Sequence, residues 1–483
     1  MTIPGTLDNH IGGKEVAARG GGRIEKFDPA TGELQSTIAR SGAADVDDAV
    51  KAAKAAQPGW AATPAVQRGQ VLHTIANLME ARADELGAVV AAETGKSRKE
   101  GKGEVGAAVQ CARFFAGEGQ RLFGRTIPSG TPGKLNLTVR TPAGVAGLII
   151  AANTPIANVA WKLFPALICG NGVVLKAAED TPFTASWTAR VALEAGLPAG
   201  LFNVVHGLGA EAGEPLVVHD EVDVVSFTGS TRVGRRLAEL AGPRLKKISL
   251  ELGGKNPFVV MDDADLDKAV RWAALSAFSN AGQRCAAGSR IILHDAIFDA
   301  FKAKFVAATE ALKLGNADTD DLGPVINARQ LGNMLAAIER AKEKGAVVLA
   351  GGSRMDRPGY FMMPTIIENF GPDDEITETE LFGPITCLYR ATSFDHAVEL
   401  ANGTPFGLTA CIHTRSFDRG LLFCERVRAG VTVINAGTHG SEAHMPFGGR
   451  GLSGNGSREP GTEALDVYSE LKNIALNVDP AQT

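Results

Sequence analysis

The chain has 483 residues, a length that predicts two to four domains at about 150 residues each. Hydrophobic residues make up 45% and charged residues 21%, and 49 basic against 54 acidic side chains give a net charge of −5. No long run of one charge and no apolar stretch of ~18 residues is present, which argues against nucleic acid and membranes as partners.

The beginning of the chain predicts a cytoplasmic protein. It lacks the charged segment followed by an apolar segment that is typical of a secretory leader. Further along, apolar residues recur with helical spacing at 71, 75, 78, 79, 86, 89 and 90, which predicts a mainly helical first quarter. The segment 124–140 is rich in Gly, Pro and Thr, and its alternating Leu135, Leu137 and Val139 predict a hairpin between domains.

Between residues 141 and 251, short apolar runs alternate with helix-length segments. The runs lie at 145–151, 172–175, 201–205 and 222–227. This alternation predicts βαβ units and a mainly parallel sheet. After the second run, Thr181 is expected to cap a helix that begins at Pro182. Lys176 and Glu179 would then lie at the carboxyl end of a strand, where open α/β sheets bind ligands.

A second α/β series is predicted after Glu251. Helical spacing lies between 297 and 312, and strand-like runs lie at 347–349 and 431–434. The predicted fold class is therefore α/β with a second domain.

Two glycines, Gly229 and Gly234, follow the strand predicted at 222–227. They begin a helix whose free amides could receive an anion, although a plain turn is equally consistent with this spacing. Arg235 and Arg236 replace the Lys-Ser/Thr of a P-loop, which argues against nucleotide triphosphatase chemistry.

Cys285 is the candidate nucleophile among the cysteines. It lies in a loop of small and polar residues beside Arg284, which is expected to expose the sulfur and favour the thiolate. No papain-type or caspase-type pattern accompanies it, so protease chemistry is poorly supported. No Cys-x-x-Cys pair is present, which suits a reducing compartment, and most of the other cysteines are expected to be buried; they are Cys111, Cys169, Cys387, Cys411 and Cys424.

Three other polar residues have two possible interpretations. Glu251 precedes two glycines that permit close backbone approach to a ligand, but a single glutamate is more simply a solvated one. His439 and His444 lack zincin spacing, so no metal is expected, and both could lie in a loop near substrate or solvent.

Five motifs occur in the order FTGSTRVG, ELGGKNP, GQRC, ELFGP and PFGGRGLSGNG across residues 227–456. This set resembles the hydrolytic branch of the aldehyde dehydrogenase superfamily, and the similarity extends to the Asn153, Lys176 and Tyr468 segments. The resemblance implies two Rossmann-like parallel-sheet domains and a small β oligomerisation element. The expected division is 1–123 with 141–252 for NAD binding, 253–452 for catalysis, and 124–140 with 466–483 for oligomerisation.

The resemblance also implies a mechanism. Cys285 would form a thiohemiacetal with the aldehyde, while the Asn153 side chain and the Cys285 amide hold the oxyanion. After hydride transfer to NAD, Glu251 would activate the water that hydrolyses the remaining thioester. Lys162 and Glu459 match residues proposed to relay the proton.

The cofactor residues follow from the same resemblance. Glu179 could accept both ribose hydroxyls of NAD and would repel the 2′-phosphate of NADP, so NAD is expected to be preferred. The matching positions are Lys176 and Glu179 for the adenosine ribose, Gly229, Ser230 and Gly234 for the pyrophosphate, and Glu380 and Phe382 for the nicotinamide side.

The substrate pocket is expected to be partly polar. Thr154 stands where an aromatic residue commonly follows the asparagine, and Gly451 stands where lysine is frequent. The segments HGSEAHMPFGG and GTEALDVYSELK are similar to enzymes that oxidise 2-oxoglutarate semialdehyde, which favours a carboxylated aldehyde and leaves simple aldehydes open. The residues expected near the substrate are Thr154, Trp161, Arg284, His439, Ser441 and His444.

Two alternatives remain at the level of sequence. An acylating enzyme would pass the thioester to coenzyme A, but it typically lacks the base at the position of Glu251. A structural or binding protein could keep the fold without activity, but Cys285 and Asn153 argue against it. The family further implies a homodimer or homotetramer.

Overall fold

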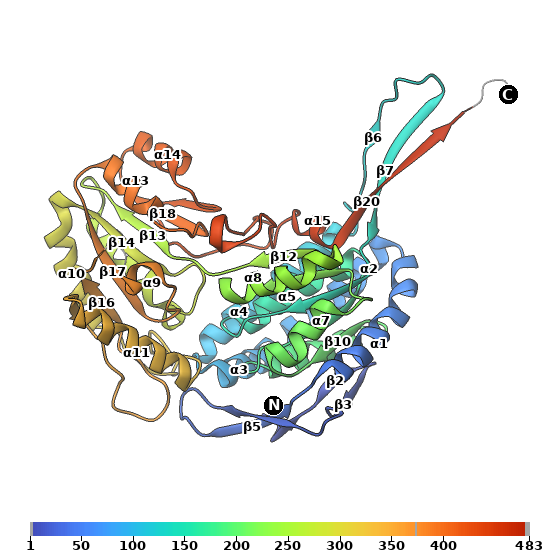
Figure 1. The fold of residues 1–483 in the computed structure, drawn as a ribbon, viewed down its shortest axis with the longest axis horizontal. Coiled ribbons are helices and arrows are strands. Elements are labelled where there is room, and N and C mark those ends of the chain that lie inside the picture. Colours follow the sequence, from blue (N-terminus) through green and yellow to red (C-terminus); the bar gives the residue numbers. More distant parts are fainter. Residues whose placement is uncertain (1–2, 372–373, 479–483) are drawn as a thin grey trace.

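The computed structural model describes residues 3–371 and 374–478. Its strands form two seven-stranded sheets, of order β12-β11-β8-β9-β10-β2-β3 and β15-β16-β17-β14-β13-β18-β19. Two three-stranded sheets, β1-β5-β4 and β20-β7-β6, complete the fold (Figure 1). The predicted α/β class is therefore confirmed. Within the described ranges, no helix is both long and apolar enough to cross a membrane.

The first large sheet is parallel in its centre. Its strands are β2 (Asn9–Ile11), β3 (Lys14–Val16), β8 (Val145–Ile149), β9 (Gly172–Lys176), β10 (Phe202–Val205), β11 (Val224–Thr228) and β12 (Lys247–Glu251). The β2-β3 hairpin joins β10 in antiparallel fashion. Its helices are α1 (Ala43–Ala62), α2 (Ala65–Ala81), α3 (Ala83–Thr94), α4 (Arg98–Glu118), α5 (Pro155–Ile168), α6 (Phe183–Glu194), α7 (Glu214–Val218) and α8 (Thr231–Ala241).

Alternate residues of β8 point into two different cores. Ala146 and Leu148 pack with α2 to α6, whereas Val145 and Ile149 pack with α1, α7 and α8. Side chains alternate along a strand, so a strand that is apolar on both faces requires helices on both. The near-continuous apolar runs seen in the sequence correspond to these doubly covered strands.

The second large sheet is built in the same way. Its strands are β13 (Asn256–Val260), β14 (Gly288–His294), β15 (Val347–Ala350), β16 (Thr365–Glu368), β17 (Ile385–Ala391), β18 (Thr409–His413) and β19 (Val431–Ile434). Helices α9 (Leu266–Phe278) and α10 (Phe298–Glu310) cover one face, and α13 (Phe394–Asn402) and α14 (Phe417–Arg426) the other. The remaining helices are α11 (Ala328–Glu343), α12 (Glu375–Glu378) and α15 (Ala464–Tyr468).

The small sheets revise two expectations. The first quarter is helical over residues 43–118 but begins with strands, including β1 (Thr6–Leu7), β4 (Arg23–Phe27) and β5 (Leu34–Ala39). The predicted hairpin is β6 (Thr126–Ile127) with β7 (Lys134–Pro142), which pairs with β20 (Ser469–Asn477). It does not lie between the large sheets but extends away from both with β20 (Figure 1). Residues 479–483 of the predicted oligomerisation element lie outside the described residues.

The predicted cap of α6 is wrong. The helix begins at Phe183 with Pro182 at the N-cap, and the buried hydroxyl of Thr181 has no hydrogen-bond partner. Instead, the carboxylate of Glu93 in α3 accepts hydrogen bonds from the amides of Phe183 at 2.8 Å and Thr184 at 3.3 Å. A partner about 90 residues away in the sequence therefore satisfies the first amides of the helix.

Candidate active site

The carboxyl ends of parallel strands in the first sheet meet a loop of the second. The segments that follow β8, β9 and β11 carry Asn153, Glu179 and Ser230, and Glu251 is the last residue of β12. The loop before β14 carries Cys285. Parallel neighbours place their carboxyl ends at the same edge of a sheet, so these side chains lie where open α/β sheets bind ligands.

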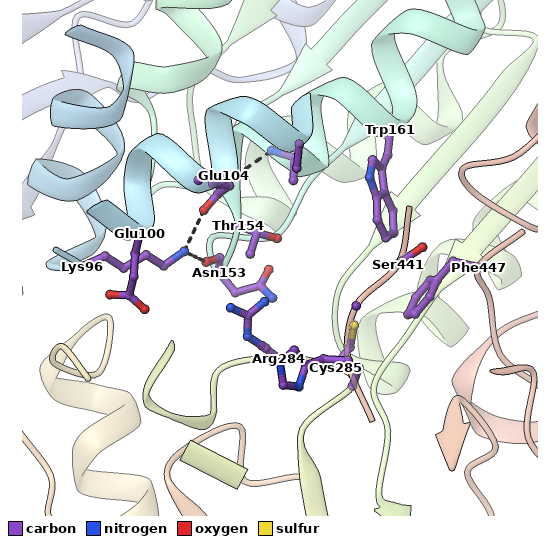
Figure 2. Close-up of a pocket in the computed structure, with 16 residues that line it drawn as sticks. Lys96, Glu100, Glu104, Asn153, Thr154, Trp161, Arg284, Cys285, Ser441 and Phe447 are labelled. Carbon is purple, nitrogen blue, oxygen red and sulfur yellow. Dashed lines mark hydrogen bonds and ion pairs between the residues drawn. The ribbon is translucent and has the colours of Figure 1, made fainter. Parts of the chain in front are cut away.

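Cys285 borders two cavities. The first cavity has a volume of about 380 Å³ and includes Arg284, His439 and Ser441 in its lining. The second has a volume of about 300 Å³ and includes Glu251. Six residues line both of them: Asn153, Thr154, Ala157, Trp161, Cys285 and Phe447. Figure 2 shows Trp161 and Phe447 on one side of the cysteine in that view, and Asn153 and Arg284 on the other.

The loop before Cys285 has an unusual backbone. Asn280 and Ala281 adopt left-handed φ angles of 56° and 53°, which non-glycine residues rarely do. The Nδ2 atom of Asn280 donates to the carbonyl of Gln283 at 3.1 Å, and that of Asn256 donates to the carbonyl of Cys285 at 2.7 Å. Side-chain amides thus hold a backbone conformation that the loop would not favour alone.

The expectation that the setting of Cys285 favours the thiolate is wrong for the resting site. Burial, together with the nearby carboxylates of Glu380 and Glu251, raises the pKa of the Cys285 thiol to about 12, and Arg284 only partly opposes this shift. Desolvation disfavours the charged form more strongly than one neighbouring guanidinium favours it. The sulfur therefore needs a proton acceptor before it can attack.

Asn153 reaches toward the loop of Cys285. Its Nδ2 atom donates to the carbonyl of Gln283 at 3.0 Å, and its Oδ1 atom accepts from Nδ2 of Asn158 at 3.2 Å. The second bond fixes which end of the amide faces the loop. An amide donor is thereby fixed beside the sulfur-bearing loop, as an oxyanion site requires.

Glu251 is a buried carboxylate without hydrogen-bond partners. Its side chain lines the second cavity, and neither carboxylate oxygen has a partner among the described residues. Burial raises the pKa of Glu251 well above its ordinary value, Glu459 raises it further, and Lys162 opposes the shift. A raised pKa and a carboxylate without a hydrogen-bond partner are typical of a group that exchanges protons during catalysis.

Lys162 and Glu459 form a buried ion pair behind the cavity. Their Nζ and Oε2 atoms lie 2.7 Å apart, with side-chain exposures of 1% and 0%. The other carboxylate oxygen of Glu459 accepts from the hydroxyls of Ser226 at 2.7 Å and Tyr468 at 3.1 Å. All these polar groups are satisfied, as buried charges require.

The predicted ribose residues are paired with each other. Nζ of Lys176 lies 3.0 Å from Oε2 of Glu179. Burial opposes ionisation of Glu179, but Lys176 and, more weakly, Arg329 lower the net pKa of this carboxyl. Glu179 is therefore an anionic acceptor at the edge of the first sheet.

The second cavity has groups that fit a dinucleotide. Gly229, Ser230, Glu380 and Phe382 line it, and Ser230 is the N-cap of α8, whose first amides lack partners within the helix. Burial raises the pKa of Glu380 to about 7, and its Oε1 atom accepts from the Gly254 amide at 3.0 Å. Amides that donate to phosphate and carboxylates that accept from ribose hydroxyls are the hydrogen-bonding groups that fit NAD.

Gly234 and His444 are two of the six predicted site residues that line neither cavity; the others are Lys162, Glu459, Lys176 and Glu179. Gly234 is in the first turn of α8, where an added Cβ would lie 2.5 Å from Leu252, so its absence of a side chain serves packing. His444 is 62% exposed and lies 4.0 Å from Glu442. Neither lines the cavities beside Cys285.

Two side chains of the first cavity have buried nitrogen atoms without partners. These are Nε of Arg284 and Nδ1 of His439. Burial lowers the pKa of His439 to about 4, and the charge of Arg284 lowers it further, so the imidazole is neutral at neutral pH. Arg284 is therefore the cation of this pair and retains hydrogen-bonding capacity toward the cavity.

Several residues of the site were not predicted from the sequence. Their contacts join segments far apart in the chain, so no local pattern marks them. The sequence gives a hint only of Lys96 and Glu104, which lie on either side of the Gly-rich start of α4. The residues are Lys96, Glu104, Asn158, Asn280 and Phe447.

A sequence model of the aldehyde dehydrogenase family matches residues 16–474. The chain belongs to the aldehyde dehydrogenase family. Its fold is also that of a putative aldehyde dehydrogenase from Burkholderia cenocepacia, with a TM-score of 0.95, 39% identity and 98% of each chain covered. The resemblance seen in the motifs is confirmed, and the protein is an enzyme that oxidises an aldehyde to its acid.

Two curated relatives act on semialdehydes according to their names. The α-ketoglutaric semialdehyde dehydrogenase of Bacillus subtilis is 38% identical over 481 residues, 98% of this chain and 99% of the relative. The succinate-semialdehyde dehydrogenase of Escherichia coli, named as NADP+-dependent, is 37% identical and covers 97% of both chains. One relative is thus named for NADP+, and the cofactor of this chain is a separate question.

Proposed function

We propose that this aldehyde dehydrogenase is a hydrolytic, NAD-preferring enzyme in which Cys285 is the nucleophile and Glu251 the base. The observation that carries the proposal is that Cys285, Asn153 and Glu251 line one cavity, and that the carboxylate of Glu251 is buried without a partner. Hydrogen bonds fix Asn153 and the loop of Cys285, whereas the carboxylate of Glu251 has no partner among the described residues and can accept a proton.

The first step forms a bond between the Cys285 sulfur and the carbonyl carbon of the aldehyde. The thiol proton leaves to a base, and the negative charge that develops on the oxygen is met by Nδ2 of Asn153 and the Cys285 amide. The 3.0 Å bond from Asn153 to the Gln283 carbonyl keeps its amide in the same loop region before substrate arrives. The fixed amide contributes most in the transition state because it needs no reorganisation.

Bound NAD would accept the hydride of the thiohemiacetal, which leaves a thioester on Cys285. The residues that would hold the cofactor are Lys176, Glu179, Gly229, Ser230, Glu380 and Phe382. Glu251 then takes a proton from water, whose oxygen attacks the thioester carbon and releases the acid and the thiolate. Lys162 and Glu459 lie behind Glu251 as a charged pair that can exchange protons with it.

Preference for NAD rests on Glu179. Its carboxylate is ionised and exposed over 34% of its side chain, with Lys176 as partner. An anion at this place repels a 2′-phosphate, whereas it can accept from two free ribose hydroxyls. Because Lys176 neutralises part of the charge, we expect a preference for NAD rather than complete exclusion of NADP.

The proposed substrate is a carboxylated semialdehyde. Arg284 adjoins the nucleophile, and its buried Nε atom has no partner in the cavity. A guanidinium binds a carboxylate through charge-assisted hydrogen bonds. The two relatives named for α-ketoglutaric semialdehyde and succinate semialdehyde are compatible with this class.

A panel of aldehydes tests the proposal as a whole. Semialdehydes, alkanals and benzaldehydes are each assayed with NAD and with NADP by NADH or NADPH absorbance, and the acid product is identified by mass spectrometry. We expect free acid without added coenzyme A, higher kcat/KM with NAD, and the highest kcat/KM with a semialdehyde. Turnover that requires coenzyme A would contradict hydrolysis, and absence of turnover with protein that binds NAD would support an inactive relative.

Assembly and location extend the proposal. Leu135, Leu471 and Leu476 are 45%, 64% and 45% exposed on the arm formed by β6, β7 and β20, which suits a homodimer or homotetramer built through this surface. We also propose the domain division expected from the sequence; one large sheet takes its strands from residues 9–251 and the other from residues 256–434, which supports it. All six cysteines are free, as a cytoplasmic location requires.

A further inference from the structure

A buried ion pair lies behind the loop that carries Asn153. Lys96 follows α3, and Glu104 is in α4; their Nζ and Oε2 atoms are 2.9 Å apart, and their side chains are 7% and 8% exposed. Figure 2 shows the pair at the edge of the first cavity, beside Asn153. Removing two charges from water is costly, so such a pair needs further hydrogen bonds to persist.

The lysine supplies one of these bonds to the backbone of Asn153. Its Nζ atom donates to the Asn153 carbonyl at 2.6 Å. Asn280 donates to the same carbonyl at 3.2 Å and to the Gln283 carbonyl at 3.1 Å. The carbonyl of Asn153 is therefore the point at which Lys96 and the cysteine loop meet.

The glutamate holds the other side of the loop. Its Oε1 atom accepts from the amide of Ile156 at 3.0 Å and, more weakly, from that of Ala157 at 3.5 Å. These are first-turn amides of α5, and Thr154 at the N-cap makes no side-chain cap. Glu104 therefore replaces the missing local cap with a carboxylate at the positive end of the helix.

We propose that Lys96 and Glu104 are positioning residues that hold the Asn153 amide in register with Cys285; this inference rests on the proposed oxyanion role of Asn153. One charge fixes the carbonyl of Asn153, the other fixes the helix that begins two residues later, and each neutralises its partner. The loop is thus clamped on both sides, while one N–H of the Asn153 side chain donates to the Gln283 carbonyl and the other remains available to the substrate. Because catalysis depends on donor placement, a displacement of about 1 Å can cost up to ~100-fold in rate.

The test separates oxyanion placement from general damage to the site. In Lys96→Met and in Glu104→Gln, we expect kcat to fall about 10- to 100-fold, while KM and the dissociation constant of NAD change less than about threefold. The rate of Cys285 alkylation by iodoacetamide should stay within about twofold, because that reaction forms no oxyanion. Glu104→Gln keeps the side-chain shape and an acceptor for the Ile156 amide, so it decides the question if Lys96→Met does not fold.

The matched control is Lys102, which lies in α4, the helix that carries Glu104. Lys102 forms an exposed ion pair with Asp84, with side-chain exposures of 58% and 86%, and Lys102→Met should leave kcat within about twofold. Conversely, Lys96→Arg keeps a donor and a charge at the Asn153 carbonyl and should restore part of the lost kcat. Alkylation that slows in parallel with kcat would overturn the inference, because the pair would then support the whole cysteine loop.

A double substitution closes the argument. In an Asn153→Ala background, Lys96→Met should lower kcat/KM by less than about twofold more, since the group it positions is already gone. A full additional loss would overturn the inference. If Asn153→Ala itself kept wild-type kcat, the proposed oxyanion role would fail; if it is impaired while Lys96→Met and Glu104→Gln are not, only the positioning role fails.

Discussion

At the scale of single residues, burial disfavours the charged form of both the nucleophile and the base. It raises the pKa of Cys285 and of Glu251; Glu380 and Glu251 add to the shift of the thiol, and Glu459 adds to the shift of Glu251. The raised pKa keeps Cys285 as a thiol, which reacts slowly with other electrophiles because the thiolate is the reactive form. The base becomes competent only when it loses its proton.

The pH dependence of thioester hydrolysis follows from Glu251. Only its carboxylate accepts a proton from water, so the rate should rise with pH through the raised pKa and level off above it. Glu251→Gln should abolish this limb and slow steady-state turnover at least about 100-fold, leaving an initial burst of NADH in stopped-flow absorbance. Glu442→Gln, at a 70% exposed side chain near the site, is the control; an unchanged steady state in Glu251→Gln would refute the base.

Arg284 should control the choice between charged and neutral aldehydes. In Arg284→Met, we expect KM for a carboxylated semialdehyde to rise about 10- to 100-fold, the loss of a charge-assisted hydrogen bond. KM for an alkanal of equal length should change little, because that substrate presents no anion. The ratio of the two KM values corrects for any effect on the adjacent Cys285, and equal changes for both aldehydes would count against a carboxylate anchor.

The residues proposed for the chemical step stand out in the sequence, and those proposed to hold them do not. Asn153, Glu251 and Cys285 each belong to a local motif at a strand end or loop. Lys96 and Glu104 act through contacts that span about 50 residues, as from Lys96 to Asn153, and no local pattern encodes them. The neutral state of Cys285 was also missed, because desolvation depends on the packed surroundings and not on the neighbouring Arg284 alone.

At the scale of elements, two helices of the first domain receive their N-terminal caps from other helices. Glu93 in α3 caps α6, and Glu104 in α4 caps α5. The apolar runs predicted β8 and β9 close to their observed bounds because these strands are covered on both faces, and they also predicted β19, an edge strand that is only partly buried. The helix starts were less predictable, because Thr181 offered a plausible local cap that the tertiary structure does not use.

The stability of the α6 connection tests this capping scheme. Glu93→Ala removes the hydrogen bonds from the amides of Phe183 and Thr184. It also removes a negative charge near the buried Lys26, so the free energy of unfolding should fall by about 2–4 kcal/mol. Thr181→Val, which replaces a buried hydroxyl without a partner by a group of the same shape, should be neutral or stabilising. Urea unfolding followed by circular dichroism measures the free energy of unfolding of both variants. A larger loss in Thr181→Val than in Glu93→Ala would indicate that Thr181 caps the helix after all.

At the scale of the whole molecule, the arm of β6, β7 and β20 extends from the body with apolar side chains exposed (Figure 1). Monomeric proteins seldom leave such a surface open. Leu471→Asp combined with Leu476→Asp should therefore shift the protein to a smaller species in light scattering coupled to size-exclusion chromatography. Phe417→Asp, at a phenylalanine 76% exposed in α14, which lies on the opposite side of the molecule from the arm in Figure 1, is the control, and an unchanged mass in the arm variant would place the interface elsewhere.

The pairing of β7 with β20 also sets an order of events during synthesis. Thr141 and Glu470, which are hydrogen-bonded in this sheet, are 329 residues apart. At about 5–20 residues per second, β7 leaves the ribosome roughly 15–65 s before its partner strand. Tyr468, which bonds to Glu459 behind the base, emerges equally late. A nascent chain therefore carries an open strand edge and an incomplete proton network for most of its translation, so chaperone protection and the onset of activity should depend on the same short segment.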